Sequence, residues 1–191
     1  KKAINDNFWV EEDGYYASYL YGRQNLTRTQ QSETLGESFC VLFGIADEER
    51  AAKVISSMPV GEFGPPIFSP QIVSQPDYHN NGVWPYVTSF WGKAAVKVGN
   101  ETALMHALAC NVRTASIYAT NYENYSFNTG NPYTTQINSP NMLWGLSGFM
   151  GLFHRTFFGL EFTKEGLALK PFVPTVLAGT RKLEAFPYRG M

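Results

Sequence analysis

The chain has 191 residues, and its 15 Lys and Arg side chains nearly balance its 16 Asp and Glu side chains. It therefore lacks the basic surplus that nucleic acids and anionic membranes select, and we expect neither as a partner. Hydrophobic residues make up 44% of the chain and charged residues only 16%, against roughly 25% charged in a typical domain. This composition excludes a disordered chain and predicts a globular protein with a large core.

Near the N-terminus, residues 8–21 are rich in aromatic side chains and contain the pair Asp13-Gly14. This pattern favours a short β-hairpin. The sequence before it, KKAIND, has neither an initiator Met nor the apolar run of a secretory signal. The pattern of residues 186–191 in turn predicts a strand with no partner strand after it in the sequence. We therefore expect a fragment of a longer protein.

Two helices are predicted next. The first follows Ser32 and ends at Gly44, because its apolar residues recur at helical spacing and Gly is a common helix end. The second runs from the N-cap Asp47 to about Ser57, with acidic residues in its first turn. The short connection between them predicts an αα-hairpin.

Residues 59–82 contain five Pro and two Gly before the turn at Gly82, and they can hold no long helix. Aromatic and aliphatic residues interleaved with them indicate an ordered loop, of a length that is usually functional. Helical periodicity returns from Trp84 to Gly99, and again after the cap Asn100 to about residue 117. These segments predict a second αα-hairpin.

A second polar loop, residues 120–140, precedes an apolar helical stretch over residues 143–157. Its interior glycines each cost about 1 kcal/mol relative to Ala, so we expect a close backbone approach there. The stretch is also shorter than the ~20 residues of a membrane-spanning helix. From Leu160 onward the spacing of apolar residues indicates β structure, with a turn at residues 164–166.

These elements predict a mainly α fold, in which successive helical hairpins form part of an (α/α)6 toroid and a short β segment closes the C-terminus. Residues 1–159 would belong to the barrel, and residues 160–191 would form the β-rich end. Cys40 and Cys110 lie in apolar surroundings without CxxC spacing. We interpret them as two buried free thiols.

The two long loops carry the residue types that bind sugars. Residues 77–85 read DYHNNGVWP and residues 121–130 read NYENYSFNTG. Aromatic faces stack on sugar rings, while Asn, His and carboxylate groups bond hydroxyls. The sequence has no HExxH, CxxC, GxSxG or Gly-rich phosphate loop, and it has only three His. We therefore expect no metal and no cofactor.

Four ordered motifs resemble the C-terminal half of six-hairpin glycosidases, nearest to the processing α-glucosidase and mannosylglycerate-hydrolase type. They are YHNNGVWP at 78–85, YENYSFNTG at 122–130, LWGLSG at 143–148 and FGL at 158–160. The resemblance covers residues 32–189 approximately. It implies an inverting glycoside hydrolase whose substrate is an oligosaccharide or glycoside with an α-linked sugar.

In that family the general base lies in the Glu-x-Tyr…Thr-Gly loop, which here matches Glu123. The general acid lies far upstream and would precede Lys1, so the isolated chain should be inactive. The resemblance also suggests which residues contact the sugar. They are Tyr78, His79, Asn80, Trp84, Tyr125 and Trp144.

Some alternatives stay open at this point. The relatives bind sugar with Tyr-Trp-Arg where this chain has Tyr78, His79 and Asn80, so the identity of the sugar is undecided. Trp84 and Trp144 fit either a hydrophobic core or a sugar-site wall. The chain could also be a noncatalytic carbohydrate-binding or structural protein, which would need no Glu123.

Two further expectations concern charge and assembly. Glu33 and Glu37 lie four residues apart, which suits acidic groups in the first turn of a helix better than a catalytic pair, because both would point the same way. An incomplete toroid would expose apolar surface on its inner helices. We therefore expect self-association through that surface.

Overall fold

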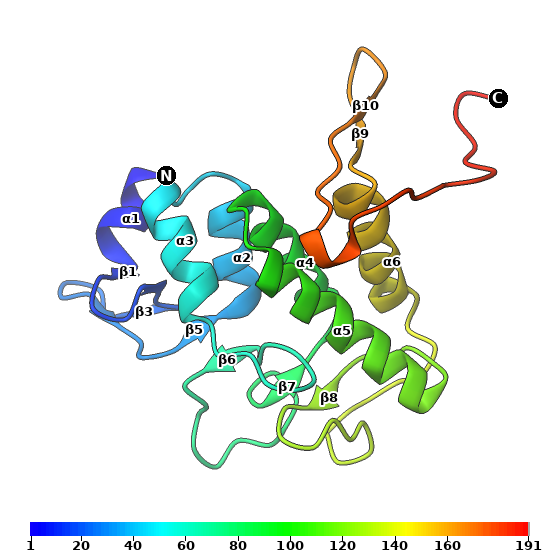
Figure 1. Cartoon of the computed structure of the whole chain (residues 1–191). Coiled ribbons are helices and arrows are strands. Elements are labelled where there is room, and N and C mark those ends of the chain that lie inside the picture. Colours follow the sequence, from blue (N-terminus) through cyan, green and yellow to red (C-terminus); the bar gives the residue numbers. More distant parts are fainter. Residues whose placement is uncertain (191) are drawn as a thin grey trace.

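The computed structural model describes residues 1–190, in which short strands alternate with helices (Figure 1). The α-helices are α1 (Lys2–Asn7), α2 (Thr34–Leu42), α3 (Glu48–Ser57), α4 (Pro85–Lys97), α5 (Glu101–Tyr118) and α6 (Leu143–Leu152). A π-helical turn, Phe153–Phe157, extends α6, and a 3-10 turn spans Thr175–Leu177.

The strands form five two-stranded antiparallel sheets, and all but two strands have only two residues. They are β1 (Trp9–Val10), β2 (Tyr15–Tyr16), β3 (Leu20–Tyr21), β4 (Thr27–Arg28), β5 (Ser32–Glu33), β6 (Phe68–Ser69), β7 (Gly82–Val83), β8 (Tyr125–Ser126), β9 (Leu160–Phe162) and β10 (Leu167–Leu169). The pairs are β1 with β2, β3 with β4, β5 with β6, β7 with β8, and β9 with β10.

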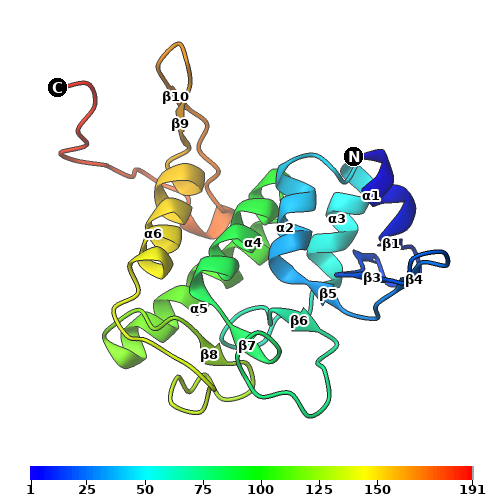
Figure 2. The same cartoon turned by 180° about the vertical axis from the view of Figure 1, so that it is seen from behind.

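Helix α4 lies at the centre of the molecule, where it packs against α2, α5 and α6. The two opposite views show α2, α4 and α6 in a row, with α3 beside α2 and α5 beside α4 (Figures 1 and 2). The loops that carry β6, β7 and β8 gather on one side of this row, below it in both views. The fold therefore presents the two long loops together.

Side-chain caps explain where three of the helices begin. Asp47 accepts a hydrogen bond from the Arg50 amide at 2.9 Å, and Asn100 accepts one from the Ala103 amide at 2.9 Å. Each bond satisfies a backbone N–H that has no partner inside its helix. Both caps agree with the sequence prediction. At α2 the cap is Glu33, one residue after the predicted Ser32.

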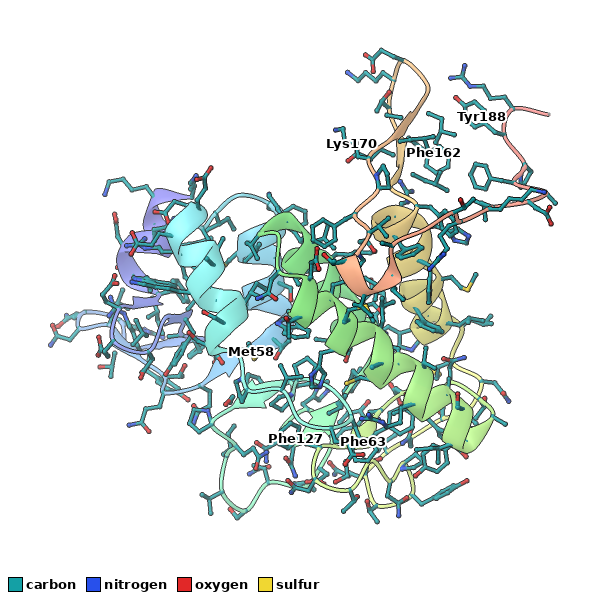
Figure 3. All side chains as sticks on the ribbon, in the orientation of Figure 1. Met58, Phe63, Phe127, Phe162, Lys170 and Tyr188 are labelled. Atoms are coloured by element: carbon teal, nitrogen blue, oxygen red, sulfur yellow. The ribbon has the colours of Figure 1, made fainter. Side chains whose placement is uncertain are left out.

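The predicted β-hairpin near the N-terminus and the predicted turn in the C-terminal β segment are both present. The β1–β2 pair encloses the Asp13-Gly14 turn, in which Gly14 has φ +72°, a conformation that favours glycine. The β9–β10 pair turns through residues 164–166. After it, the chain returns to this hairpin, and the Phe162 ring lies 6.4 Å from the Tyr188 ring (Figure 3).

The predicted mainly α toroid of helical hairpins is wrong. The fold is a small mixed α/β one, with 39% of residues in helices and 13% in strands. Only α4 and α5 exceed ten residues, whereas the toroid required at least four such helices. The physical reason lies in the Pro- and Gly-rich segments, because their backbone groups pair across loops as β5–β6 and β7–β8 instead of extending helices. The division after residue 159 stays a prediction.

The main hydrophobic core joins α2, α3, α4 and α5 to the first hairpin. Cys40 and Cys110 are buried free thiols, as predicted. Within residues 1–190, no helix combines the length and apolar character that crossing a membrane requires. The expected close backbone approach occurs at Gly148, where a Cβ would lie only 3.2 Å from the Tyr86 ring. Helices α6 and α4 can therefore pack closely at this point.

Candidate functional site

The predicted general base, Glu123, lies beside the predicted sugar-contact residue Tyr78. The Tyr78 hydroxyl donates a hydrogen bond to Glu123 Oε1 at 3.4 Å. The two residues are 45 positions apart, and the β7–β8 pair brings their loops together by aligning Gly82 with Ser126 and Val83 with Tyr125. Burial, and then the nearby Glu123 carboxylate, raises the pKa of Tyr78. Tyr78 therefore stays a hydrogen-bond donor to Glu123.

Asp77 fixes the position of these loops, although the sequence did not single it out. Its Oδ2 accepts a hydrogen bond from the Ser126 hydroxyl at 2.7 Å, and its Oδ1 accepts one from the Asn81 amide at 2.9 Å. Its backbone carbonyl also accepts a bond from the Gln136 amide at 2.8 Å. One carboxylate thus ties Tyr78 to the segment that follows Glu123.

Contacts between aromatic rings and glycines reinforce the link between the loops. A Cβ at Gly130 would lie 2.4 Å from the Phe63 ring, and a Cβ at Gly61 would lie 2.7 Å from the Phe127 ring. Phe63 and Phe127 both lie at the loop end of the molecule (Figure 3). Each loop thus provides an aromatic ring that packs on a glycine of the other loop.

An aromatic series leads away from Glu123. The Tyr78 ring centroid lies 5.1 Å from that of Trp84, which lies 5.4 Å from that of Trp144. Trp144 in turn lies 4.7 Å from Tyr86, a residue that the sequence did not single out. Trp84 is buried, and its indole nitrogen donates to the Tyr78 carbonyl at 3.0 Å. Trp84 therefore supports the series, while the half-buried Tyr78, Tyr86 and Trp144 form its accessible part.

The other predicted sugar-contact residues divide into an exposed one and two buried ones. His79 is exposed, and its ring stacks on Trp84 at 5.1 Å. Asn80 is buried, and its amide bonds to the Ile72 backbone and the Gln75 carbonyl. Tyr125 is fully buried, and its hydroxyl accepts a bond from the Tyr122 amide at 3.2 Å. The structure therefore brings His79 to the aromatic series and uses Asn80 and Tyr125 inside the loops.

Glu33 and Glu37, which we expected as acidic groups in the first turn of a helix, meet this expectation only in part. Glu33 caps the helix by accepting bonds from the Leu35 and Gly36 amides at 3.1 and 2.6 Å. Burial raises the pKa of Glu33, while these two amides and the nearby His79 act in the opposite direction. Glu33 therefore lies close to the aromatic series, but its carboxylate is committed to the helix.

Glu37 differs from a solvated first-turn charge, because only 1% of it is exposed. Its Oε1 accepts a bond from the Tyr16 amide at 2.7 Å, whereas its Oε2 has no hydrogen-bond partner within the described residues. It borders a cavity of about 190 Å³ that Glu33 also lines. Burial raises the pKa of Glu37 from 4.5 to about 8. A single sequence carries no signal for such burial.

Taken together, the loops assemble one carboxylate, one phenolic donor and several accessible aromatic faces. Across residues 1–190, no three His, Cys, Asp or Glu side chains are grouped as a metal site. Neither the family models nor the curated proteins that were compared with the chain match it. The chemistry of this site must therefore be argued from its own geometry, which suits the binding of a hydroxyl-rich ring beside a carboxylate.

Proposed function

We propose that the chain carries the general-base half of an inverting glycoside hydrolase that acts on α-linked sugars, with the general acid supplied from outside residues 1–191. The observation that carries this proposal is the bond from Tyr78 to Glu123 at the end of the aromatic series. The Tyr78 hydroxyl holds one oxygen of Glu123, and the other oxygen has no hydrogen-bond partner within residues 1–190. That second oxygen is available to a water molecule.

The mechanism follows from this arrangement. A sugar ring lies against the accessible faces of Tyr78 and Trp144, and its hydroxyls bond to the surrounding polar groups. The free oxygen of Glu123 accepts a proton from water, which attacks the anomeric carbon. An external carboxylic acid protonates the departing oxygen. In an inverting enzyme the two carboxyls lie about 6.5–9.5 Å apart, so that the water fits between them.

The stereochemistry of the product tests this proposal. We expect the complete enzyme to release a sugar of inverted anomeric configuration, as seen by proton NMR in the first minutes of hydrolysis. A product of retained configuration requires a carboxylate nucleophile only about 5 Å from the acid. That result would exclude Glu123 as a base acting through water.

The aromatic faces should affect binding more than chemistry. We expect Trp144→Ala to raise KM or Kd for the glycoside by about tenfold while kcat changes less, because stacking acts equally on ground and transition states. Tyr78→Phe provides a second comparison, since it keeps the ring and removes only the bond to Glu123. It should leave affinity almost unchanged and lower kcat. Steady-state kinetics measure both effects, and the reverse pattern would contradict these roles.

One observation favours a noncatalytic sugar-binding protein as the second candidate. The aromatic faces of Tyr78, Tyr86 and Trp144 are accessible within residues 1–190, and such faces can bind a sugar without any acid. The two candidates differ in one measurement. A binding protein keeps its affinity for sugar but shows no Glu123-dependent turnover even when the complete polypeptide is assayed.

A further inference from the structure

A further hollow borders Tyr78. Its volume is about 290 Å³, near the small end of the ~300–1,000 Å³ that ligand sites occupy. We name it the outer cavity. Its lining residues are Phe68, Ile72, Gln75, Pro76, Tyr78, His79, Asn80 and Gln136. Tyr78 is shared, since its hydroxyl reaches Glu123 and the residue lines the outer cavity.

Three polar side chains of the outer cavity are free to bind a ligand, whereas those of Tyr78 and Asn80 already form hydrogen bonds. No hydrogen bond within residues 1–190 occupies the side chains of Gln75, His79 or Gln136, although their neighbours form many. Amide side chains offer both donors and acceptors, which matches the dual character of sugar hydroxyls. Phe68 and Tyr78 add apolar faces to the same wall. The lining therefore combines the two kinds of contact that a sugar ring makes.

The walls of the outer cavity are held in place before any ligand arrives. The side-chain oxygen of Asn80 accepts a bond from the backbone N–H of Ile72 at 2.7 Å. Its side-chain nitrogen donates to the backbone carbonyls of Ile72 and Gln75 at 3.0 and 3.3 Å. Gln136 is held through its backbone, because its backbone N–H donates to the Asp77 carbonyl at 2.8 Å. Fixed walls reduce the entropy that a ligand must offset on binding.

The charge of the lining restricts the ligand. None of the eight lining residues is Asp, Glu, Lys or Arg, so the cavity offers no fixed positive charge to a carboxylate or sulfate group. Carboxylate and phosphate ligands are usually held by Arg or Lys through charge-assisted hydrogen bonds, and the lining has neither residue. An uncharged sugar therefore fits this lining better than an acidic one.

We propose that the outer cavity binds a second, uncharged sugar unit of the substrate, next to the unit that Glu123 contacts. This inference rests on the proposed function, and it narrows the substrate to neutral α-linked saccharides of at least two units. The side chains of Gln75 and Gln136 bond to the hydroxyls of the second unit. Tyr78 separates the two binding positions and contacts both sugars.

Binding measurements on the full chain test the outer cavity without requiring catalysis. Calorimetry or ligand-observed NMR compares glucose, mannose and galactose with the α-linked disaccharide of each. We expect at least one disaccharide to bind more tightly than its monosaccharide. Gln136→Ala should weaken that disaccharide by about three- to tenfold, which is the effect of one or two neutral hydrogen bonds, and should leave the monosaccharide unchanged. The α-linked galacturonate disaccharide should bind more weakly than its galactose counterpart.

The matched control is Gln24→Ala, because Gln24 is an exposed glutamine between β3 and β4 that does not line the outer cavity. If Gln136→Ala and a Gln75→Ala/Gln136→Ala variant bind the disaccharide as the Gln24→Ala protein does, the outer cavity is not a sugar site. The same conclusion follows if no neutral disaccharide binds more tightly than its monosaccharide. Loss of turnover in Glu123→Gln would then still support the general base. Conversely, parental turnover in Glu123→Gln would remove the general base and leave the cavity assignment intact.

Discussion

In the proposed glycoside hydrolase, Glu123→Gln should reduce turnover by about 10²–10⁴-fold. A positioned general base contributes rate enhancement of this size, and Gln keeps the shape of Glu while it removes the basic oxygen. The Tyr78 hydroxyl can still donate to the amide oxygen of Gln, so the loop geometry should be preserved. Sugar affinity should therefore change by only a few-fold. The measurement is kcat and Kd for the same glycoside in both proteins.

Glu165→Gln serves as the control, because Glu165 is an exposed carboxylate in the turn between β9 and β10. It removes one negative charge far from the loops and should leave turnover at the parental rate. A Glu123→Gln protein that also hydrolyses at the parental rate would show that Glu123 is not the base. A loss of both turnover and sugar affinity would instead indicate that Glu123 mainly binds the sugar.

Local sequence signals predicted the helices well. The caps Asp47 and Asn100 lie where they were expected, because an N-cap acts on backbone groups only two or three residues away. The hairpin around Gly14 and the turn at residues 164–166 were predictable for the same reason. In each case the stabilising contact lies within a few residues along the chain.

The short sheets that join distant segments were not predictable, since a two-residue strand is too short to show alternating hydrophobicity. The pairs β5–β6 and β7–β8 join distant segments, since Glu33 pairs with Phe68, 35 residues later, and Val83 pairs with Tyr125, 42 residues later. Such contacts depend on how the loops meet in space. The helix spacing alone therefore suggested a toroid, whereas the loops in fact form small β structures.

The candidate site shows the same limit. The sequence placed Tyr78 and Glu123 in sugar-binding loops, and the structure brings them together. Nothing in the sequence indicated that Asp77 would join those loops, because the partners of Asp77, Ser126 and Gln136, lie far along the chain. The sequence also indicated Asn80 and Tyr125 as sugar contacts, whereas both side chains are bonded within the loops. Residue type alone could not show which of these side chains stay accessible, because burial decides that.

Glu37 should make the stability of the protein fall as the pH rises from about 4.5 to 8. Burial raises the pKa of Glu37 to about 8 in the folded chain, from 4.5 for an unburied Glu. Between these values the folded state holds a proton that the unfolded state has lost, so folding is favoured by acid. The contribution is complete below pH 4.5 and disappears as the pH passes 8. The expected slope in the unfolding free energy is about 1.4 kcal/mol per pH unit.

Glu37→Gln should remove this slope, because Gln does not titrate and its amide oxygen can still accept the bond from the Tyr16 amide. Denaturant unfolding between pH 5 and 9 measures the difference between the two proteins. Burial raises the pKa of Tyr16 and of Cys40 to about 12, but both residues are present in the two proteins, so their own pH dependence cancels in the difference. Glu33 lies near Glu37, and Arg50 lies near Tyr16. Both charged residues are present in the two proteins. The exposed Glu12→Gln variant is the matched control and should follow the parental curve.

We expect the Glu37→Gln protein to be the more stable one above pH 8, and a pH-independent difference would show that Glu37 titrates normally. If the variant does not fold, the carboxyl carbon of Glu37 in the parental chain, followed by NMR, should titrate near pH 8 rather than near 4.5.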